Sequence, residues 1–243
     1  MQLAHNTVLV TGGASGIGLA LAQRFLGAGN EVIVCGRREE VLSEAKARFP
    51  ALHTRVCDVG DAEQRESLFE WVARDFPALN VLVNNAGIQR RIDLSEPENW
   101  SQTRSELAIN LEAPIHLSQL FLPHLRRQPR AAILNVSSGL AFAPIAAMPI
   151  YCASKAALHS FTLSLRQQLS SSSVEVIEII PPAVNTDLGG PGLHTFGEPL
   201  DEFADDIFAR LGGNELEIAY GTAAKASRAS RDELDQAFAA MNS

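Results

Sequence analysis

A predicted strand, a glycine-rich turn and the start of a helix follow one another at the N-terminus of the chain. Residues 7–11 read Thr-Val-Leu-Val-Thr, and glycines follow at positions 12, 16 and 18. Gly12, Gly16 and Gly18 carry no side chain where a backbone has to turn tightly and approach a pyrophosphate. The N-terminus of the next helix would then offer free N–H groups to phosphate oxygens. A simple tight turn is the alternative, but the preceding strand favours a nucleotide-binding turn.

This unit begins an alternation of short β-rich runs and longer helical patterns. The strand candidates are 7–10, 31–35, 53–57, 81–83, 131–136, 174–180 and 216–219. The helical candidates are 18–26, 38–49, 62–76, 100–127 and 151–169. Several strand candidates are continuous apolar runs, as in strands that are covered by helices on both faces. The pattern therefore predicts an α/β fold with a doubly wound parallel sheet of about seven strands, in a single domain over residues 1–243.

Three segments are expected to depart from this regular pattern. The helical stretch 100–127 contains Pro114 and Pro123, which predict a kink or a break. Residues 181–199 are irregular and rich in proline and glycine, and they follow the sixth strand at the edge where ligands bind in such sheets. We expect this segment to be a substrate lid. The end of the chain carries Leu234, Phe238 and Met241 at helical spacing, which predicts a final packing helix.

Composition excludes several classes of function. With 46% hydrophobic and 20% charged residues, the chain of 243 residues can form a sizeable core. Its net charge of −8 argues against general binding to nucleic acid or anionic membranes. Cys35, Cys57 and Cys152 show no Cys-x-x-Cys spacing, so we expect buried thiols, without disulfides or a metal site. There is no signal-peptide pattern and no apolar run long enough to span a membrane, so a cytoplasmic protein is expected.

The chemistry of the chain is expected to centre on Tyr151 and Lys155. They stand four residues apart, about one helical turn, so both side chains would project from the same face. A free phenol has a pKa near ~10, and a cation held beside it favours the phenolate and lowers that pKa. Ser138 lies upstream and could hydrogen-bond a substrate oxygen. The spacing alone is common in helices, so its meaning depends on the nucleotide-binding turn before it.

The end of the second predicted strand bears on the choice of cofactor. An NAD-selective site usually has an acidic residue there, but this chain has Gly36. Arg37, and with it Arg38, could pair with a 2′-phosphate, so NADP(H) is favoured and NAD(H) remains possible. The alternative is that both arginines begin a solvated helix. Asp58, after the third strand, could accept a hydrogen bond from an adenine amino group or could equally be a helix N-cap.

Together these motifs resemble the short-chain dehydrogenase/reductase family, over residues 5–220. Residues 11–18 match its Thr-Gly-x-x-x-Gly-x-Gly signature and residues 84–87 its Asn-Asn-Ala-Gly motif. The order and spacing of its catalytic tetrad are matched by Asn110, Ser138, Tyr151 and Lys155. The resemblance implies a hydride-transfer enzyme built on a Rossmann-like three-layer sandwich. Stretches 85–92, 181–184 and 188–196 further resemble a DltE-type branch of bacterial oxidoreductases, a label that gives no substrate.

The resemblance also implies roles for the four tetrad residues. Tyr151 would be the general acid in carbonyl reduction or the base in alcohol oxidation, and Lys155 would lower its pKa and bind the nicotinamide ribose. Ser138 would orient the substrate oxygen, and Asn110 would hold a water that links Lys155 to solvent. The alternatives are structural: Asn110 as a polar residue at the helix kink, and Ser138 as a strand-end hydroxyl bonded to backbone.

Further residues are implied as cofactor contacts. They are Gly12, Ser15, Gly16, Ile17, Gly18, Arg37, Arg38, Asp58, Val59, Asn85, Ala86, Gly87, Tyr151, Lys155, Ala183, Val184 and Thr186. Asn84 is expected to brace the sheet instead. Where the family usually has Pro-Gly after the sixth strand, this chain has Pro181-Pro182-Ala183, so the backbone beside the nicotinamide must differ.

The substrate is expected to be a small carbonyl compound or secondary alcohol. Residues 89–91, Gln-Arg-Arg, could bind an anion or be solvated surface residues, and the apolar stretch 139–149 could form a pocket wall, core or a subunit contact. Two other functions are considered: reduction of 3-oxoacyl groups on acyl carrier protein, and cofactor sensing by a regulator that has lost its chemistry. Small residues in 151–169 permit close helix packing, and the resemblance implies a homodimer or homotetramer.

Overall fold

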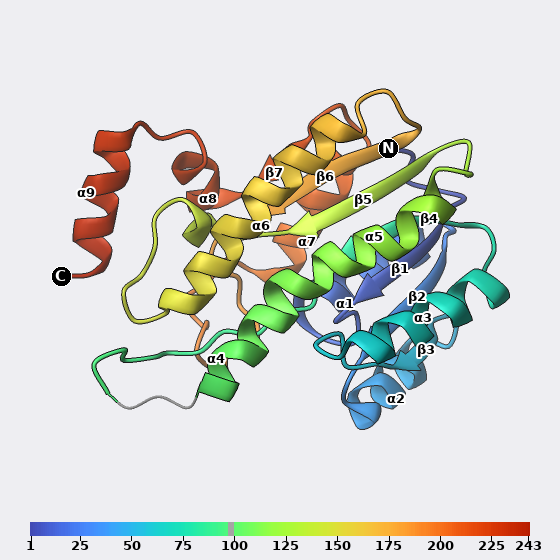
Figure 1. Ribbon diagram of the computed structural model, residues 1–243, viewed down its shortest axis with the longest axis horizontal. Helices are drawn as coiled ribbons and strands as arrows, with labels where there is room; N and C mark the ends of the chain where they lie inside the picture. The colour runs from blue at the N-terminus through green and yellow to red at the C-terminus, as the bar shows by residue number, and fades with distance from the viewer. Residues whose placement is uncertain (97–99) are drawn as a thin grey trace.

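Seven parallel strands form one sheet at the centre of the molecule (Figure 1). The computed structural model describes residues 1–96 and 100–243. The strands are β1 (Thr7–Thr11), β2 (Glu31–Gly36), β3 (His53–Val56), β4 (Leu79–Asn84), β5 (Ala131–Val136), β6 (Val174–Ile180) and β7 (Glu217–Ala219). Their order is β3-β2-β1-β4-β5-β6-β7, and every neighbouring pair is parallel. The predicted doubly wound α/β fold is confirmed.

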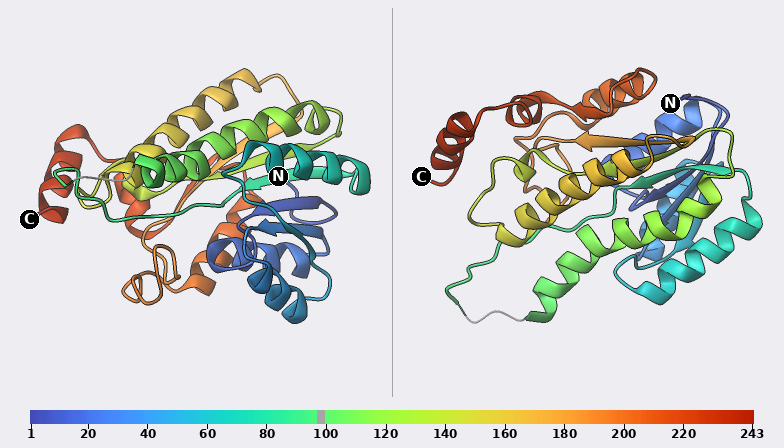
Figure 2. Two further views of the ribbon diagram at one scale, coloured as in Figure 1. Left: turned by 60° about the horizontal axis from the view of Figure 1, so that its bottom comes forward. Right: turned by 45° about the horizontal axis from the view of Figure 1, so that its top comes forward.

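Helices cover both faces of this sheet (Figures 1 and 2). The helices of eight or more residues are α1 (Gly16–Gly27), α2 (Glu39–Arg48), α3 (Ala62–Asp75), α4 (Trp100–Leu107), α5 (Ala113–Leu125), α6 (Pro149–Gln168), α7 (Leu200–Leu211) and α9 (Arg231–Met241). A short helix α8 (Gly221–Ala226) follows β7. The chain runs outward in opposite directions from β1 and β4, which are neighbours. Ligands bind beyond the carboxyl ends of the strands at such a switch point.

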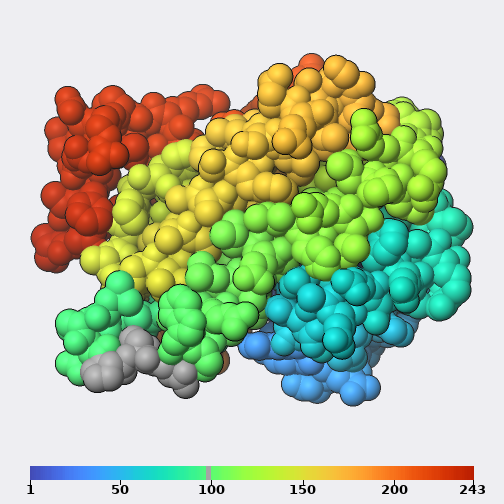
Figure 3. Space-filling view, in the orientation of Figure 1, coloured from blue at the N-terminus to red at the C-terminus, as the bar shows by residue number. Residues whose placement is uncertain are grey.

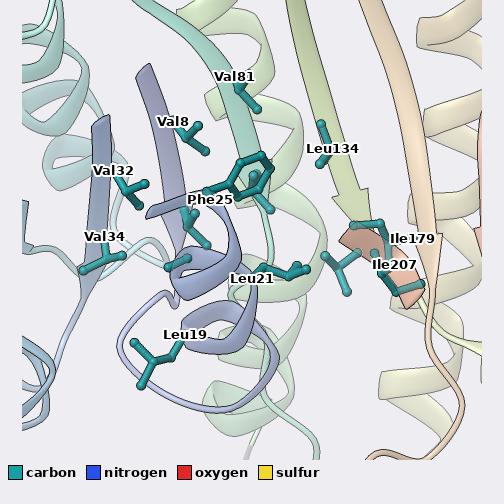
Figure 4. Close-up of a cluster of buried hydrophobic side chains, with 14 of the residues drawn as sticks. Val8, Leu19, Leu21, Phe25, Val32, Val34, Val81, Leu134, Ile179 and Ile207 are labelled. Carbon is teal, nitrogen blue, oxygen red and sulfur yellow. The ribbon is translucent and has the colours of Figure 1, made fainter. Parts of the chain in front are cut away.

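The continuous apolar strands are explained by two hydrophobic cores, one on each face. Val8 and Val10 of β1 pack with Phe25 of α1 in one core, which Figure 4 shows in close-up. Leu9, between them, points to the opposite face and packs with Phe121 of α5. All five side chains are fully buried, because successive residues of a strand point to opposite faces and both faces are covered.

The predicted break in the helical stretch 100–127 occurs, but not at both prolines. Residues Ala108–Glu112 form a π-helical turn, in which the Ala113 N–H donates to the Ala108 carbonyl five residues back. Pro114 follows in the first turn of α5, where its missing N–H cannot make the α-helical bond to Asn110. Pro123 lies inside α5 and does not end it, so the helix is not broken there.

Two helices near the C-terminus differ from expectation. Helix α7 was not predicted, although Phe203, Ile207 and Leu211 at helical spacing are its buried residues. The final helix forms as α9, but it does not pack as predicted. Phe238 is 43% and Met241 42% exposed, and α9 lies apart from the sheet (Figures 1 and 2). In the space-filling view, the C-terminal segment lies at one end of the molecule (Figure 3). The sequence shows that a helix is amphipathic but not whether a partner surface is within reach.

Candidate active site

Two glycines of the turn after β1 have backbone conformations that other residues rarely adopt. Gly12 and Gly16 have φ of 62° and 51°, in the left-handed region that favours glycine. A Cβ on Gly18 would lie 2.4 Å from both the Asn85 amide nitrogen and the Gly12 carbonyl oxygen. Ser15 is the N-cap of α1, but its exposed side chain makes no capping hydrogen bond. The first N–H groups of α1 can therefore meet an anion.

Thr11 fixes this turn against the end of β4. Its hydroxyl accepts hydrogen bonds from the N–H groups of Asn85 and Ala86, each at 3.0 Å, and donates to the Val83 carbonyl at 3.2 Å. The Asn85 amide donates to the carbonyls of Thr11 at 2.9 Å and Gly12 at 3.3 Å. The amide of Asn85 thus holds the turn itself. Sequence reasoning did not single out Thr11, whose position at the end of a strand was the available signal.

The two arginines after β2 occupy different places. The Arg38 guanidinium donates to the Ser15 hydroxyl at 3.5 Å, which sets it beside the glycine turn. Arg37 is exposed, and Arg38 is also the N-cap residue of α2. The structure therefore brings Arg38 to the glycine-rich turn, and Arg38 also stands at the start of helix α2, as the alternative expected.

Asp58 closes a turn between β3 and α3. Its carboxylate accepts from the Gly60 N–H at 2.9 Å. The N-cap of α3 is Asp61, which accepts from the N–H groups of Glu63 and Gln64, so the N-cap alternative for Asp58 is wrong. Val59 is buried in the core on the α3 side, so any contact it makes with a nucleotide is through its backbone.

The four tetrad residues meet beyond the carboxyl ends of β4 and β5. Tyr151 and Lys155 lie on α6, both buried, with the Lys155 Nζ atom 5.7 Å from the centre of the Tyr151 ring. Ser138 lies near the Tyr151 hydroxyl, and its side chain acts to lower the pKa of that group. A Cβ placed on Gly87 would lie 3.5 Å from the Asn110 Oδ1 atom and 3.6 Å from the Lys155 Nζ atom. Residues that are far apart in the sequence therefore surround one point.

Asn110 and Ser138 also have structural contacts, as the alternatives expected. The Asn110 amide donates to the Ile88 carbonyl at 2.8 Å and to the Ser154 hydroxyl at 3.2 Å, and its oxygen accepts from the Ile88 N–H at 2.9 Å. The Ser138 hydroxyl accepts from the Leu140 N–H at 3.1 Å. Asn110 thus joins the segment after β4 to α6.

Burial governs the protonation of the tyrosine–lysine pair. Burial raises the pKa of Tyr151 to about 12, while the Ser138 side chain acts in the opposite direction. Burial lowers the pKa of Lys155 to about 8. For Tyr151, the effect of burial outweighs any lowering of the pKa by the lysine. The Lys155 ammonium lies over the ring and donates to the Val136 carbonyl at 2.8 Å, so loss of water around the phenolate dominates.

A buried carboxylate that sequence reasoning missed lies beside Tyr151. Glu106 of α4 is fully buried, and within the described residues neither of its carboxylate oxygens has a hydrogen-bond partner. Burial raises its own pKa, and its charge helps to raise that of Tyr151. The Arg90 guanidinium lies 3.9 Å away and also donates to the Gln102 carbonyl at 2.7 Å. Arg90 is therefore tied to α4, whereas Arg91 is exposed.

The segment 181–199 lies over the glycine turn and the segment after β4. Its ends are joined by the Asn185 N–H donating to the Glu198 carbonyl and the Glu198 N–H donating to the Ala183 carbonyl, each at 2.9 Å. Thr186 lies 3.5 Å from the position of a Cβ on Gly16, and the Gln89 carbonyl lies 3.3 Å from that of a Cβ on Gly189.

Three further predicted residues or segments are placed around this loop. The Val184 side chain is in the core, so only its backbone is free to face the site. Ala183 gives its carbonyl to Glu198. The apolar stretch 139–149 is half-buried along most of its length, as a pocket wall would be. Asn84 braces the sheet as predicted, because its amide donates to the Asn135 side chain on β5 at 2.9 Å.

Comparisons with known proteins decide the family. The model of the short chain dehydrogenase family matches residues 6–193. The Bacillus subtilis (strain 168) protein named Uncharacterized oxidoreductase DltE is 49% identical over 248 residues, which cover 100% of this chain and 98% of that protein. The chain belongs to the short-chain dehydrogenase family.

Other members support the same assignment to the short-chain dehydrogenases. An L-xylulose reductase of Caenorhabditis elegans is 36% identical over 75% of this chain and 73% of its own. A short chain dehydrogenase from Burkholderia cenocepacia J2315, solved in complex with NADP, has a TM-score of 0.85 and 26% identity, covering 98% of this chain and 99% of that one. The chain is thus an oxidoreductase, and its Rossmann-like fold is that of its family.

Some features are absent from the described part of this short-chain dehydrogenase. Within residues 1–96 and 100–243, no helix is long and apolar enough to cross a membrane. In the same residues, no group of three or more His, Cys, Asp or Glu side chains could hold a metal ion. Cys35, Cys57 and Cys152 are free and buried.

Replacing Gly18 by alanine should destabilise the protein, because the new Cβ would lie 2.4 Å from the Gly12 carbonyl oxygen. Overpacking of this kind costs about 1–3 kcal/mol. Gly27→Ala, in the same helix, is the matched control: no atom lies within 4 Å of its Cβ, and alanine favours a helix by about 0.5–1 kcal/mol. Urea denaturation measures both free energies of unfolding. Equal stability of the Gly18 variant and the unmodified protein would contradict the close approach.

Proposed function

We propose that this oxidoreductase reduces a small carbonyl compound with NADPH and that Tyr151 is the proton donor. The observation that carries the proposal is the buried contact of Tyr151 with Ser138 and Lys155 beside the glycine turn. Oxidation of the corresponding secondary alcohol is the reverse of the same reaction.

The turn after β1 fits a dinucleotide phosphate. A Cβ on Gly18 would collide with the glycine-rich turn, so the backbone there is open to a ligand. The uncapped start of α1 offers N–H groups to an anion. Arg38, beside Ser15, would pair with a 2′-phosphate and so select NADP(H) over NAD(H). The NADP complex of the Burkholderia relative is consistent with this choice. When bound, the nicotinamide supplies the hydride.

The protonation of the pair supports the reductive direction. A phenol with its pKa raised to about 12 keeps its proton at neutral pH, so Tyr151 can protonate the oxygen of a reacting carbonyl. The Ser138 hydroxyl would orient that oxygen. Lys155, with its pKa lowered to about 8, can exchange a proton near neutral pH and would restore the tyrosine proton. Asn110 would hold a water on this proton route.

The surroundings of Tyr151 suggest how substrate is enclosed. Residues 181–199 would close over the site as a lid, since they contact both the glycine turn and Gln89. The half-buried stretch 139–149 would supply an apolar wall. Gln89 and Arg90, at the edge of this space, are held by packing and by α4 and would not be free to bind an anionic group.

Tyr151→Phe should reduce carbonyl-dependent NADPH consumption at least about 100-fold, because it removes the proton donor and leaves the ring in place. The second of the two tyrosines in the chain provides the control, and Tyr220→Phe should retain activity. Absorbance at the nicotinamide band follows turnover with a panel of aldehydes and ketones, and fluorescence titration follows NADPH binding. Full activity of Tyr151→Phe refutes the assignment. Tight binding without turnover in the unmodified protein would favour a cofactor-sensing role.

Arg38→Ala should weaken NADPH binding about tenfold and leave NADH binding unchanged, because it removes a charge-assisted hydrogen bond to the 2′-phosphate. Arg48→Ala, on the same helix α2 and far along it, serves as the control. Calorimetric titration of both cofactors against each variant makes the comparison. Equal losses for NADPH and NADH would show that Arg38 does not read the 2′-phosphate.

A further inference from the structure

A third polar side chain continues the row formed by Tyr151 and Lys155 on helix α6. His159 follows Lys155 by four residues, one helical turn, and so lies on the same face. Its Nδ1 atom is 2.8 Å from the Glu178 Oε2 atom on β6. The His159 ring also contacts Phe142, with ring centres 4.7 Å apart. The row therefore ends in a close pair of ionisable groups that the proposed mechanism does not use.

Glu178 stands where an apolar residue would be expected. It is fully buried, and its neighbours Ile177 and Ile179 are core residues of a strand that is covered on both faces. Within the described residues, its Oε1 atom has no hydrogen-bond partner. A carboxylate in such a place is costly unless nearby positive charge compensates it. Glu178 lies close to the candidate site, which suggests that its charge acts on the titratable groups there.

The strand register sets Glu178 beside the anchor of Lys155. The Lys155 ammonium donates to the Val136 carbonyl at 2.8 Å, and Val136 pairs with Ile179, the residue after Glu178. Burial lowers the pKa of Lys155, and the negative charge of Glu178 acts in the opposite direction. Glu178 also raises the pKa of His159, chiefly through their hydrogen bond. One carboxylate therefore interacts with two titratable bases.

Other charged groups act on this region from the elements around it. They are Tyr151 and Arg166 on α6, Glu106 on α4 and Glu217 on β7. Glu106 acts on Tyr151, while Glu217 and Arg166 have opposite effects on His159. Arg166 and Glu217 form an ion pair with each other at 2.9 Å, so their effects at His159 partly cancel.

We propose that Glu178, which is hydrogen-bonded to His159, is a positioning residue whose carboxylate keeps Lys155 protonated in its buried place beside Tyr151. The proposal rests on the proposed function of Lys155 next to the proton donor. The negative charge of Glu178 favours the ammonium form of Lys155, and a proton on His159 would offset part of that charge. Without the carboxylate, Lys155 must lose its proton at a lower pH.

The test measures the titration of Lys155 directly. The chain has three lysines, Lys46, Lys155 and Lys225, so ε-¹³C-labelled lysine gives few NMR signals, and Lys155→Arg assigns the relevant one. In Glu178→Gln the Lys155 midpoint should move to lower pH by about one pH unit, the lower end of the effect of a close opposite charge. Glu175→Gln, on the same strand but exposed, is the matched control and should leave the midpoint unchanged.

Two more variants separate charge from packing. Glu178→Asp keeps the carboxylate and should retain a midpoint near that of the unmodified protein. His159→Gln should not move the midpoint to lower pH, because it leaves the carboxylate in place. An unchanged Lys155 midpoint in Glu178→Gln overturns the proposal. The proposal is also overturned if the Lys155 midpoint falls as far in His159→Gln as it does in Glu178→Gln. If Glu178→Gln does not fold, Glu178→Met removes the same charge with an apolar side chain, and an unchanged Lys155 midpoint in that variant overturns the proposal.

An activity measurement keeps this proposal distinct from the proposed function. In a protein that turns over, the alkaline limb of the pH profile of kcat should move to lower pH in Glu178→Gln together with the NMR midpoint. If the NMR midpoint of Lys155 moves but the alkaline limb of the kcat profile does not, Lys155 protonation does not limit turnover, and the link between Glu178 and the proton route is overturned. A protein that reduces no carbonyl refutes the proposed function, and the NMR titration still decides whether Glu178 supports Lys155.

Discussion

Buried hydrogen bonds fix helix α6 on the sheet, and the geometry of the candidate site depends on them. The Lys155 ammonium donates to the Val136 carbonyl of β5 at 2.8 Å, and the Asn135 amide donates to the Thr162 hydroxyl at 2.9 Å. Asn110 adds a bond to Ser154 at 3.2 Å. Between the helix and the sheet the dielectric constant is low, and a buried polar group without a hydrogen bond costs free energy there. The helix therefore has one favourable rotation and position. That position directs Tyr151 towards Ser138.

The site is further defined by two buried carboxylates that act on different members of the pair. Glu106 helps to raise the pKa of Tyr151, and Glu178 opposes the lowering of the pKa of Lys155. Both effects favour the protonated forms. A phenol and an ammonium that hold their protons are suited to donating one to a carbonyl oxygen, so the electrostatics agree with the reductive direction we propose.

Local sequence patterns sufficed for the sheet, and the family resemblance for the four tetrad residues that meet at its edge. The apolar runs of β5 and β6 mark buried strands, and parallel strands bring their carboxyl ends to one edge, which collects Ser138 and the residues after Asn84 there. The π-helical turn around Asn110 could not be predicted from the sequence. A proline indicates that the α-helical hydrogen bonding is interrupted, but not which hydrogen-bonding pattern takes its place.

Long-range effects explain the remaining differences. The pKa of Tyr151 is raised chiefly by burial among segments distant in the sequence, which the spacing to Lys155 does not reveal. Glu106 and Glu178 look like ordinary helix and strand residues until packing removes their water. The sequence shows the amphipathic pattern of α9, yet Phe238 and Met241 are exposed and not buried in a core. In each case the deciding quantity is the tertiary surroundings of the side chain.

Transfer of deuterium from NADPH labelled at nicotinamide C4 tests the central claim most directly. The protein is mixed with each stereospecifically labelled cofactor and a panel of small aldehydes and ketones, and mass spectrometry follows the alcohol products. The account predicts that one of the two labelled forms delivers deuterium to the former carbonyl carbon, and that Tyr151→Phe binds the cofactor but delivers almost none. Cofactor binding by the unmodified protein without deuterium in any product would contradict it.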